Sequence, residues 1–190
     1  GLDLVAWPLR IAAGEPLPLR QDEVQFARHA IEVRLYAEDP YQGFAPQTGR
    51  IAYWRPDSVL REGLRIDSGI AEGGTVSPHY DAMVAKLIAH GRDRSDAIRR
   101  LRAALADAPL LGLNNNARFL RDLLADATFG DASMTTTLLD EWQAAGTPLF
   151  QRPAPDDEHW CIAAAALALR NGAGWRPASV AMFEMRLRCN

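Results

Sequence analysis

The fold follows from one stretch of sequence, HAIEVRLYAEDP, at residues 29–40. Within it Ile31, Val33 and Leu35 are apolar, and the residues between them are charged. Because successive side chains of a strand point to opposite faces, this alternation predicts a β-strand with one face in a core and the other facing a cleft or water. The Asp-Pro pair at its end predicts that the strand stops there, since proline lacks a backbone donor.

Shorter strands are predicted on the C-terminal side of this stretch, at residues 50–55, 64–68 and 74–77. Glycines and aspartates separate them, so their spacing predicts an antiparallel meander. Residues 81–89 are apolar at positions that fit either a short helix or a buried strand, and the pattern leaves both alternatives open.

A helical period follows these strands. Ser95 is the predicted N-cap of the first helix. Its apolar face comprises Ile98, Leu101, Ala104 and Leu105. Three asparagines at residues 114–116 predict a turn and a cap, and residues 119–124 predict a second helix. Strands early and helices late predict an α+β domain, an antiparallel sheet meander followed by packed helices.

Both ends of the chain depart from this pattern. Apolar residues between positions 4 and 13 predict a helix, in which Pro8 should produce a kink or a new start. Residues 143–158 are rich in proline and acidic side chains and predict a linker. The apolar run at residues 160–169 is too short to span a membrane and predicts a buried helix, with a lipid-facing or partner-facing surface as the alternative. We expect a domain at residues 1–142, truncated at its start, and an incomplete segment at residues 159–190.

The composition argues against several classes of protein. A net charge of -3 gives no attraction to nucleic acid or to anionic membranes. Cys161 and Cys189 predict neither a metal pair nor a disulfide framework, and the four histidines lack the spacing of metal ligands. The start of the chain has no signal-peptide pattern, so we expect part of a cytoplasmic enzyme. Lys86 is the single lysine among 21 basic residues, which indicates a general bias of the sequence toward arginine. Clusters of arginines are therefore interpreted as a solvated helix face and not as a binding site.

The best candidate for chemistry is the polar face of the first strand. Glu32 and Arg34 are two residues apart and therefore share that face. A carboxylate and a guanidinium on a rigid strand could form a catalytic or anion-binding pair, and the alternative is an ion pair between strands on an exposed face. The run His79-Tyr80-Asp81 could be part of an acid/base set or a polar loop cluster that holds the start of a helix.

The ordered motifs of this sequence resemble those of biotin carboxylases. The stretch at residues 29–40 is similar to the corresponding run of that family in its His-Ala, Glu, Arg and Ala-Glu-Asp-Pro positions. Further similar segments follow in order: residues 1–14, PQTG at 46–49, RID at 65–67, SPHYDAMVAK at 77–86, and the Leu-Gly pair at 111–112 with Asn116. The resemblance covers roughly residues 1–140.

The resemblance implies an ATP-grasp enzyme that carboxylates carrier-bound biotin with bicarbonate and MgATP. Arg34 matches the family arginine that binds the ureido oxygen of biotin, where its charge stabilises the anion that makes N1 nucleophilic. By the same resemblance Glu32 positions this arginine, and Thr136, Thr137 and Leu138 lie on the adenine side of the ATP site. The phosphate-binding lysines and the two magnesium-binding glutamates belong upstream of residue 1, so we expect no metal ligands here and no activity of the fragment alone.

The resemblance also implies partners. Lys86 does not lie in the motif that attaches biotin, so we expect no covalent biotin on this chain. The tail is similar to acyl-CoA carboxylase α subunits of the methylcrotonoyl or propionyl type, in which this region contacts the carboxyltransferase β subunit. We expect the methylcrotonoyl type, self-association through the carboxylase module, and a biotin carrier domain as a further partner. The alternatives are a propionyl- or acetyl-CoA carboxylase subunit, or a non-catalytic assembly module of the same complex.

Overall fold

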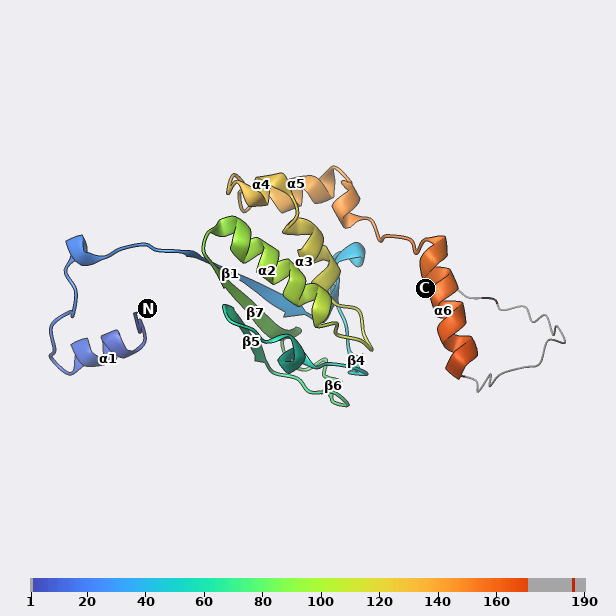
Figure 1. The fold of residues 1–190 in the computed structure, drawn as a ribbon, viewed down its shortest axis with the longest axis horizontal. Coiled ribbons are helices and arrows are strands. Elements are labelled where there is room, and N and C mark those ends of the chain that lie inside the picture. Colours follow the sequence, from blue (N-terminus) through green and yellow to red (C-terminus); the bar gives the residue numbers. More distant parts are fainter. Residues whose placement is uncertain (1, 171–185, 187–190) are drawn as a thin grey trace. The chain divides into compact units, whose positions relative to one another are not determined.

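The computed structural model of the chain describes residues 2–170 and residue 186 (Figure 1). The chain divides into two compact units, Gly1–Thr136 and Thr137–Asn190. Each unit is described separately below. No helix within the described residues is long and apolar enough to cross a membrane.

A three-stranded antiparallel sheet is the centre of the first unit. It comprises β1 (His29–Tyr36), β5 (Leu64–Ser68) and β7 (Met83–Gly91), in the order β1-β7-β5. The register pairs His29 with Gly91 and Arg34 with Lys86, and a bulge interrupts it between Leu35 and Tyr36. The predicted first strand is confirmed, because its odd-numbered residues from 31 to 35 are buried and the charged residues between them are exposed.

The antiparallel pairing is confirmed, but the strand order differs from that of a meander. β7 is the last of these strands in the chain, and it lies between the other two. The reason lies in its composition: Val84, Ala85, Leu87 and Ala89 are all buried, so this strand is apolar enough for the central position. The structure therefore decides the open alternative at residues 81–89 in favour of a buried strand.

Two small two-stranded sheets flank the main sheet. β2 (Glu38–Asp39) pairs with β3 (Ala45–Pro46), and β4 (Gly49–Arg50) pairs with β6 (Thr75–Val76). The strand predicted at residues 50–55 is shorter because its backbone bonds to loops, with the Ala52 amide donating to the Leu111 carbonyl at 2.8 Å. Gly112 permits this approach, since its φ is +117° and a Cβ there would lie 2.3 Å from the Arg50 carbonyl oxygen.

Helix α2 (Arg94–Asp107) covers one face of the main sheet (Figure 1). Its predicted apolar face is confirmed: Leu101, Ala104 and Leu105 are buried in the common core. The predicted N-cap is wrong, because Ser95 is the second residue of the helix and Asp93 is the cap. The Asp93 carboxylate accepts a hydrogen bond of 2.7 Å from the Asp96 amide, which satisfies one of the free amides of the first turn.

Shorter helices complete the first unit. The turn predicted at residues 114–116 is confirmed, and Asn116 is the N-cap residue of α3 (Ala117–Leu123). Pro8 lies in the first turn of α1 (Ala6–Ala12), where no helical amide is required, as expected if the helix starts anew there. The remaining elements are α4 (Ala127–Gly130), η1 (Gln21–Glu23), η2 (Pro40–Gln42) and η3 (Pro56–Val59).

The second unit contains α5 (Leu138–Ala144), η4 (Pro148–Phe150) and α6 (Asp157–Arg170). The helix predicted from the apolar run at residues 160–169 is confirmed, but its described side chains are not buried. Ile162 is 61% exposed and Leu167 is exposed as well. The physical reason is its composition, since a run of alanines at 163–166 gives little apolar area to bury. Cys161 is exposed, whereas the predictions for Cys189 and for most of residues 171–190 lie outside the described residues.

Candidate site on strand β1

Strand β1 brings the two predicted site residues together. Glu32 and Arg34 project from the exposed face of the sheet, opposite to the core, as their spacing predicts. The Arg34 Nε donates to Glu32 Oε1 at 3.4 Å, and the two side chains remain 58% and 39% exposed. The hydrogen bond with Glu32 and then the neighbouring Tyr36 raise the pKa of Arg34 above its ordinary value. Arg34 is therefore a permanent positive charge open to a ligand.

A second cation shares Glu32. Lys86 lies opposite Arg34 in the β1–β7 register, and its Nζ is 3.9 Å from Glu32 Oε1. The ion pair between strands that the sequence left as an alternative is therefore present as well. It coexists with the Arg34–Glu32 pair, and both are long and solvated, so neither removes Arg34 from solvent.

The free edge of β1 carries the other polar groups of the site. An open hollow of about 400 Å³ lies beside it. Its lining residues come from β1, β2, α3 and α4 and include Arg34, Tyr36, Glu38, Asn116, Leu120 and Phe129. Burial raises the pKa of Glu38, and the charge of Asp81 adds to this, while a hydrogen bond from Asn116 acts in the opposite direction. The hollow thus combines an apolar floor with an arginine, a carboxyl and an amide.

The predicted run at residues 79–81 is a loop cluster. The Asp81 carboxylate accepts from the Met83 amide at 3.1 Å, and the Ser77 hydroxyl accepts from the His79 amide at 3.1 Å. The loop-cluster alternative is therefore the observed one, but the cluster holds the start of β7, a strand, and not the start of a helix. The charge of Asp81 also raises the pKa of Glu38 at the edge of β1.

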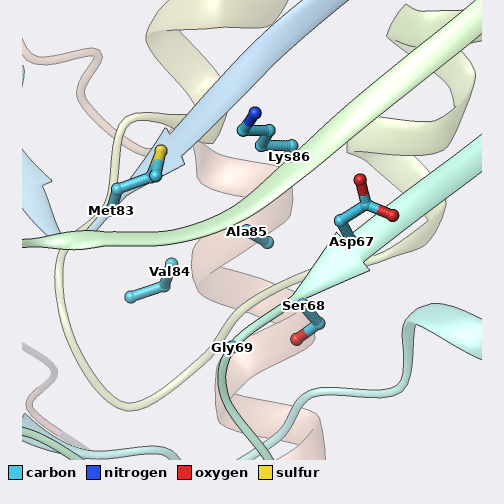
Figure 2. Close-up of a pocket in the computed structure, with 7 residues that line it drawn as sticks. All are labelled: Asp67, Ser68, Gly69, Met83, Val84, Ala85 and Lys86. Atoms are coloured by element: carbon cyan, nitrogen blue, oxygen red, sulfur yellow. The ribbon is translucent and has the colours of Figure 1, made fainter. Parts of the chain in front are cut away.

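A second hollow of about 260 Å³ lies between β5 and β7 (Figure 2). Figure 2 shows Asp67 and Lys86, which are paired in the strand register, at this hollow. Arg65 holds Asp67 through two hydrogen bonds of 2.8 Å, and this contact is the main cause that lowers the pKa of Asp67. Arg34 does not line this hollow, but Lys86 does, and its ion pair with Glu32 joins the two polar regions on one face of the sheet.

The predicted adenine-side residues fall at the boundary of the two units. Thr136 is the last residue of the first unit and is exposed, whereas Thr137 and Leu138 belong to the second. The Thr137 hydroxyl donates to Glu141 at 3.2 Å and so serves its own helix. Their role at ATP stays a prediction. The described residues contain no group of three or more His, Cys, Asp or Glu side chains that could hold a metal ion.

The geometry and the motifs agree with one family. The biotin carboxylase C-terminal domain, as a family model, matches residues 32–141. The chain belongs to this family. The match begins within β1, includes Glu32 and Arg34, and ends within α5, so the site around Arg34 lies inside the biotin carboxylase C-terminal domain.

Relatives and solved structures agree with this assignment. The chain is 40% identical over 140 residues to methylcrotonoyl-CoA carboxylase subunit alpha, mitochondrial, of Arabidopsis thaliana, covering 74% of this chain and 19% of that protein. It is 41% identical over 143 residues to propionyl-CoA carboxylase alpha chain, mitochondrial, of Caenorhabditis elegans, covering 74% and 20%. Among solved structures, it is similar to the biotin carboxylase domain dimer of Hydrogenobacter thermophilus 2-oxoglutarate carboxylase, in complex with MgADP, ADP and bicarbonate. The TM-score is 0.68 at 33% sequence identity, and the superposition covers 80% of this chain and 32% of that chain. The chain thus spans about a fifth of the length of the two acyl-CoA carboxylase subunits.

The sequence did not predict the groups at the β1 edge. Glu38 and Asn116 stand 78 positions apart, yet Asn116 Nδ2 donates to Glu38 Oε1 at 3.1 Å. Two signals were present: the run of three asparagines predicted a cap, and the family resemblance included Glu38 and Asn116 without giving them a role. Neither signal could indicate that the third asparagine turns its side chain toward β1.

Proposed function

We propose that this domain supplies the biotin-binding arginine of an ATP-dependent biotin carboxylase. The observation that supports it is Arg34, a charged and exposed guanidinium held on a paired strand in a chain of the biotin carboxylase family. Five N–H donors in a fixed plane suit the ureido oxygen of biotin, which becomes more negative as N1 loses its proton. Stabilisation of that charge is an electrostatic contribution to the transition state.

The residues of the chain fit biotin better than they fit ATP or magnesium. Biotin supplies the nitrogen that accepts the carboxyl group, and the open face beside Arg34 leaves that guanidinium accessible to its ureido oxygen. Glu32 holds the Nε side of the guanidinium and so sets its direction. We assign MgATP and bicarbonate to the ATP-grasp part of a full-length enzyme, because this chain covers only 32% of the related biotin carboxylase domain that is in complex with MgADP and bicarbonate.

The finer proposal is an α subunit of the methylcrotonoyl-CoA carboxylase type in the cytoplasm. Its partners would be a second copy of the carboxylase module, a carboxyltransferase β subunit and a biotin carrier domain. The Arabidopsis relative supports the methylcrotonoyl type, and the Caenorhabditis relative supports the propionyl alternative to a similar degree. Acyl-CoA-dependent turnover of the complete complex, compared between methylcrotonoyl-CoA and propionyl-CoA, distinguishes these two.

The test of the main proposal is a polypeptide in which the ATP-grasp part of a related biotin carboxylase precedes this chain. We expect bicarbonate-dependent ATP hydrolysis that free biotin stimulates, and no such activity in the 190-residue chain alone. Arg34→Ala should reduce the biotin-stimulated rate by about 10²–10³, the usual effect of removing one donor from a developing anion.

Arg102→Ala is the matched control, because Arg102 is an exposed arginine on α2, which packs against the buried face of the sheet, opposite to the face that carries Arg34. It should leave the biotin-stimulated rate unchanged. Unaltered turnover in Arg34→Ala would remove Arg34 from the biotin site. The second candidate, an assembly module without catalytic residues, predicts instead that deletion of residues 143–190 changes the oligomeric state in size-exclusion chromatography while Arg34→Ala changes nothing.

A further inference from the structure

We infer that Asn116 is a positioning residue that fixes the backbone of β1 at Arg34. Its importance for catalysis depends on the proposed function, whereas its effect on the position of Arg34 does not. Asn116 is one of the few buried polar residues of the described chain and is 5% exposed. It lies at the start of α3, and its side chain is turned away from its own helix, to which it makes no capping hydrogen bond.

The side chain of Asn116 bonds to the free edge of β1. Its Oδ1 accepts from the Tyr36 amide at 2.9 Å, and its Nδ2 donates to the Arg34 carbonyl at 3.2 Å. The Asn116 backbone amide also donates to the Tyr36 carbonyl at 3.1 Å. In a sheet these edge groups would bond to a neighbouring strand, because the N–H and C=O of one residue point to the same side. Here a single asparagine takes the place of that strand.

The position of this contact along β1 gives it its importance. The pairing of β1 with β7 is regular up to Leu35 and then shifts at a bulge before Tyr36. Arg34 is therefore the last outward-facing residue before the ladder becomes irregular. A bulge bends a strand and disrupts its ladder of hydrogen bonds. β7 therefore fixes the backbone of Arg34 from one side only. Asn116 constrains the same residue from the other side.

The hydrogen bonds also determine the orientation of the amide. Nδ2 has a second acceptor, Glu38 Oε1 at 3.1 Å, so both of its neighbours are oxygens that accept. The opposite orientation would place an N–H against the Tyr36 N–H and an oxygen against two oxygens. A buried amide with all its groups satisfied is rigid, because any movement would leave polar groups unpaired.

Asn115 provides a matched comparison in the same turn. Its Nδ2 donates to the Leu110 carbonyl at 3.0 Å, and its Oδ1 accepts from the Ala117 amide at 3.1 Å. These bonds are internal to the turn and to the start of α3. Loss of Asn115 therefore perturbs the turn without touching β1, whereas loss of Asn116 releases β1 at Arg34.

The structural test uses the 190-residue chain and amide hydrogen exchange followed by NMR. Asn116→Ala should raise the exchange rate of the Tyr36 amide about tenfold or more and shift the Arg34 Nε–H signal. Asn115→Ala should change neither by more than about twofold. Equal effects of the two variants, or an unchanged Tyr36 amide in Asn116→Ala, would overturn the inference.

A second variant keeps the test decisive if Asn116→Ala fails to fold. Asn116→Asp retains the acceptor for the Tyr36 amide but loses the donors to the Arg34 carbonyl and Glu38. We expect the Tyr36 amide to stay protected from exchange while the Arg34 Nε–H signal shifts. Protonation of the new carboxyl at low pH should move that signal back toward its position in the wild type at the same pH. A signal identical to wild type at every pH would count against the inference.

The functional test uses the ATP-grasp fusion. In Asn116→Ala the KM for free biotin should rise about tenfold, because displacement of a positioned group by about 1 Å can cost up to 10²-fold. Asn115→Ala should leave the KM unchanged. Equal losses in both variants would make Asn116 a purely structural residue. A parent fusion without biotin stimulation would count against the proposed function alone, since the exchange measurements judge Asn116 independently.

Discussion

Among the carboxylates of this domain that pair with cations, Asp96 and Glu32 lie in opposite settings. Asp96, at the start of α2, has a side chain only 3% exposed, and it pairs with Arg99 at 2.6 Å and Arg100 at 3.0 Å. Glu32, on β1, is 39% exposed and pairs with Arg34 at 3.4 Å and Lys86 at 3.9 Å. The first carboxylate is enclosed by short contacts, whereas the second is held loosely in solvent.

The difference separates a structural network from the proposed binding surface. The hydrogen bond from Arg99 is the main cause of a strongly lowered pKa at Asp96, and the Arg92 amide contributes next. Arg100 also donates to the Glu62 carbonyl at 2.7 Å, so this network ties α2 to the loop before β5. At Glu32 the cations remain free to meet a ligand. We expect substitutions at Asp96 to affect stability, and those around Glu32 to affect binding.

Among the substitutions that test this comparison, Asp96→Ala should have the largest effect, a fall in the Tm. Removal of the carboxylate leaves the Arg92 amide and two guanidiniums without their acceptor, and we expect the Tm to fall by roughly 5–10 °C. Because folding lowers the pKa of Asp96, its stabilisation is present above the ordinary aspartate pKa and is lost as the pH falls below it. Thermal unfolding monitored by circular dichroism from pH 3 to pH 7 tests both points.

Two outcomes would contradict this division of roles. One is a Tm of Asp96→Ala equal to that of the wild type at pH 7. The other is a biotin-stimulated rate in the fusion that falls at a temperature where the variant is fully folded. Asp107→Ala is a suitable control, because Asp107 forms a single exposed ion pair with Arg61 at 2.9 Å on the same helix.

Local periodicity explains what the sequence could predict of the fold. The two faces of β1 follow from alternation within a few residues, and the apolar face of α2 follows from spacings of three and four. The central place of β7 does not follow, because the register that pairs Arg34 with Lys86 joins residues far apart in the chain. The cap of α2 was misplaced because Ser95 and Asp93 are both competent caps, and only the folded turn shows which one the Asp96 amide reaches.

The same limit applies to the site. Spacing alone placed Glu32 and Arg34 on one face, and the family resemblance supplied the role of Arg34. Neither indicated a role for Asn116 beside Arg34, because its hydrogen bond to the Arg34 carbonyl crosses 82 positions of sequence. An asparagine in a run of three is typical of a turn. Its side-chain partner is set by tertiary packing and leaves no mark on the local pattern.

A smaller effect, of opposite sign to that of Asp96, is expected from Glu38→Gln. Burial is the main cause that raises the pKa of Glu38, so its ionisation destabilises the folded state as the pH rises above the ordinary glutamate pKa. Glutamine keeps an oxygen for Asn116 Nδ2 and cannot ionise. We expect the Tm of the variant to exceed the wild type by about 1–2 °C at pH 8 and to equal it near pH 4. Glu62→Gln, at an exposed position, should show no such difference, and a lower Tm of Glu38→Gln at pH 8 would contradict the prediction.

The smallest effect is expected from Lys86→Met, which tests whether the ion pairs of Glu32 contribute little to stability and to biotin binding. Methionine preserves the aliphatic part of the side chain in the central strand and removes only the charge. The Lys86–Glu32 pair is long and more than a third exposed at both ends, and pairs of this kind contribute little to stability. The Tm should therefore stay within about 1 °C of the wild type. The KM of the fusion for biotin should change less than about threefold, because Arg34 keeps its own contact with Glu32. A tenfold change in KM with an unaltered Tm would instead make Lys86 a second cation of the binding surface, and Lys86→Arg would then restore the wild-type value.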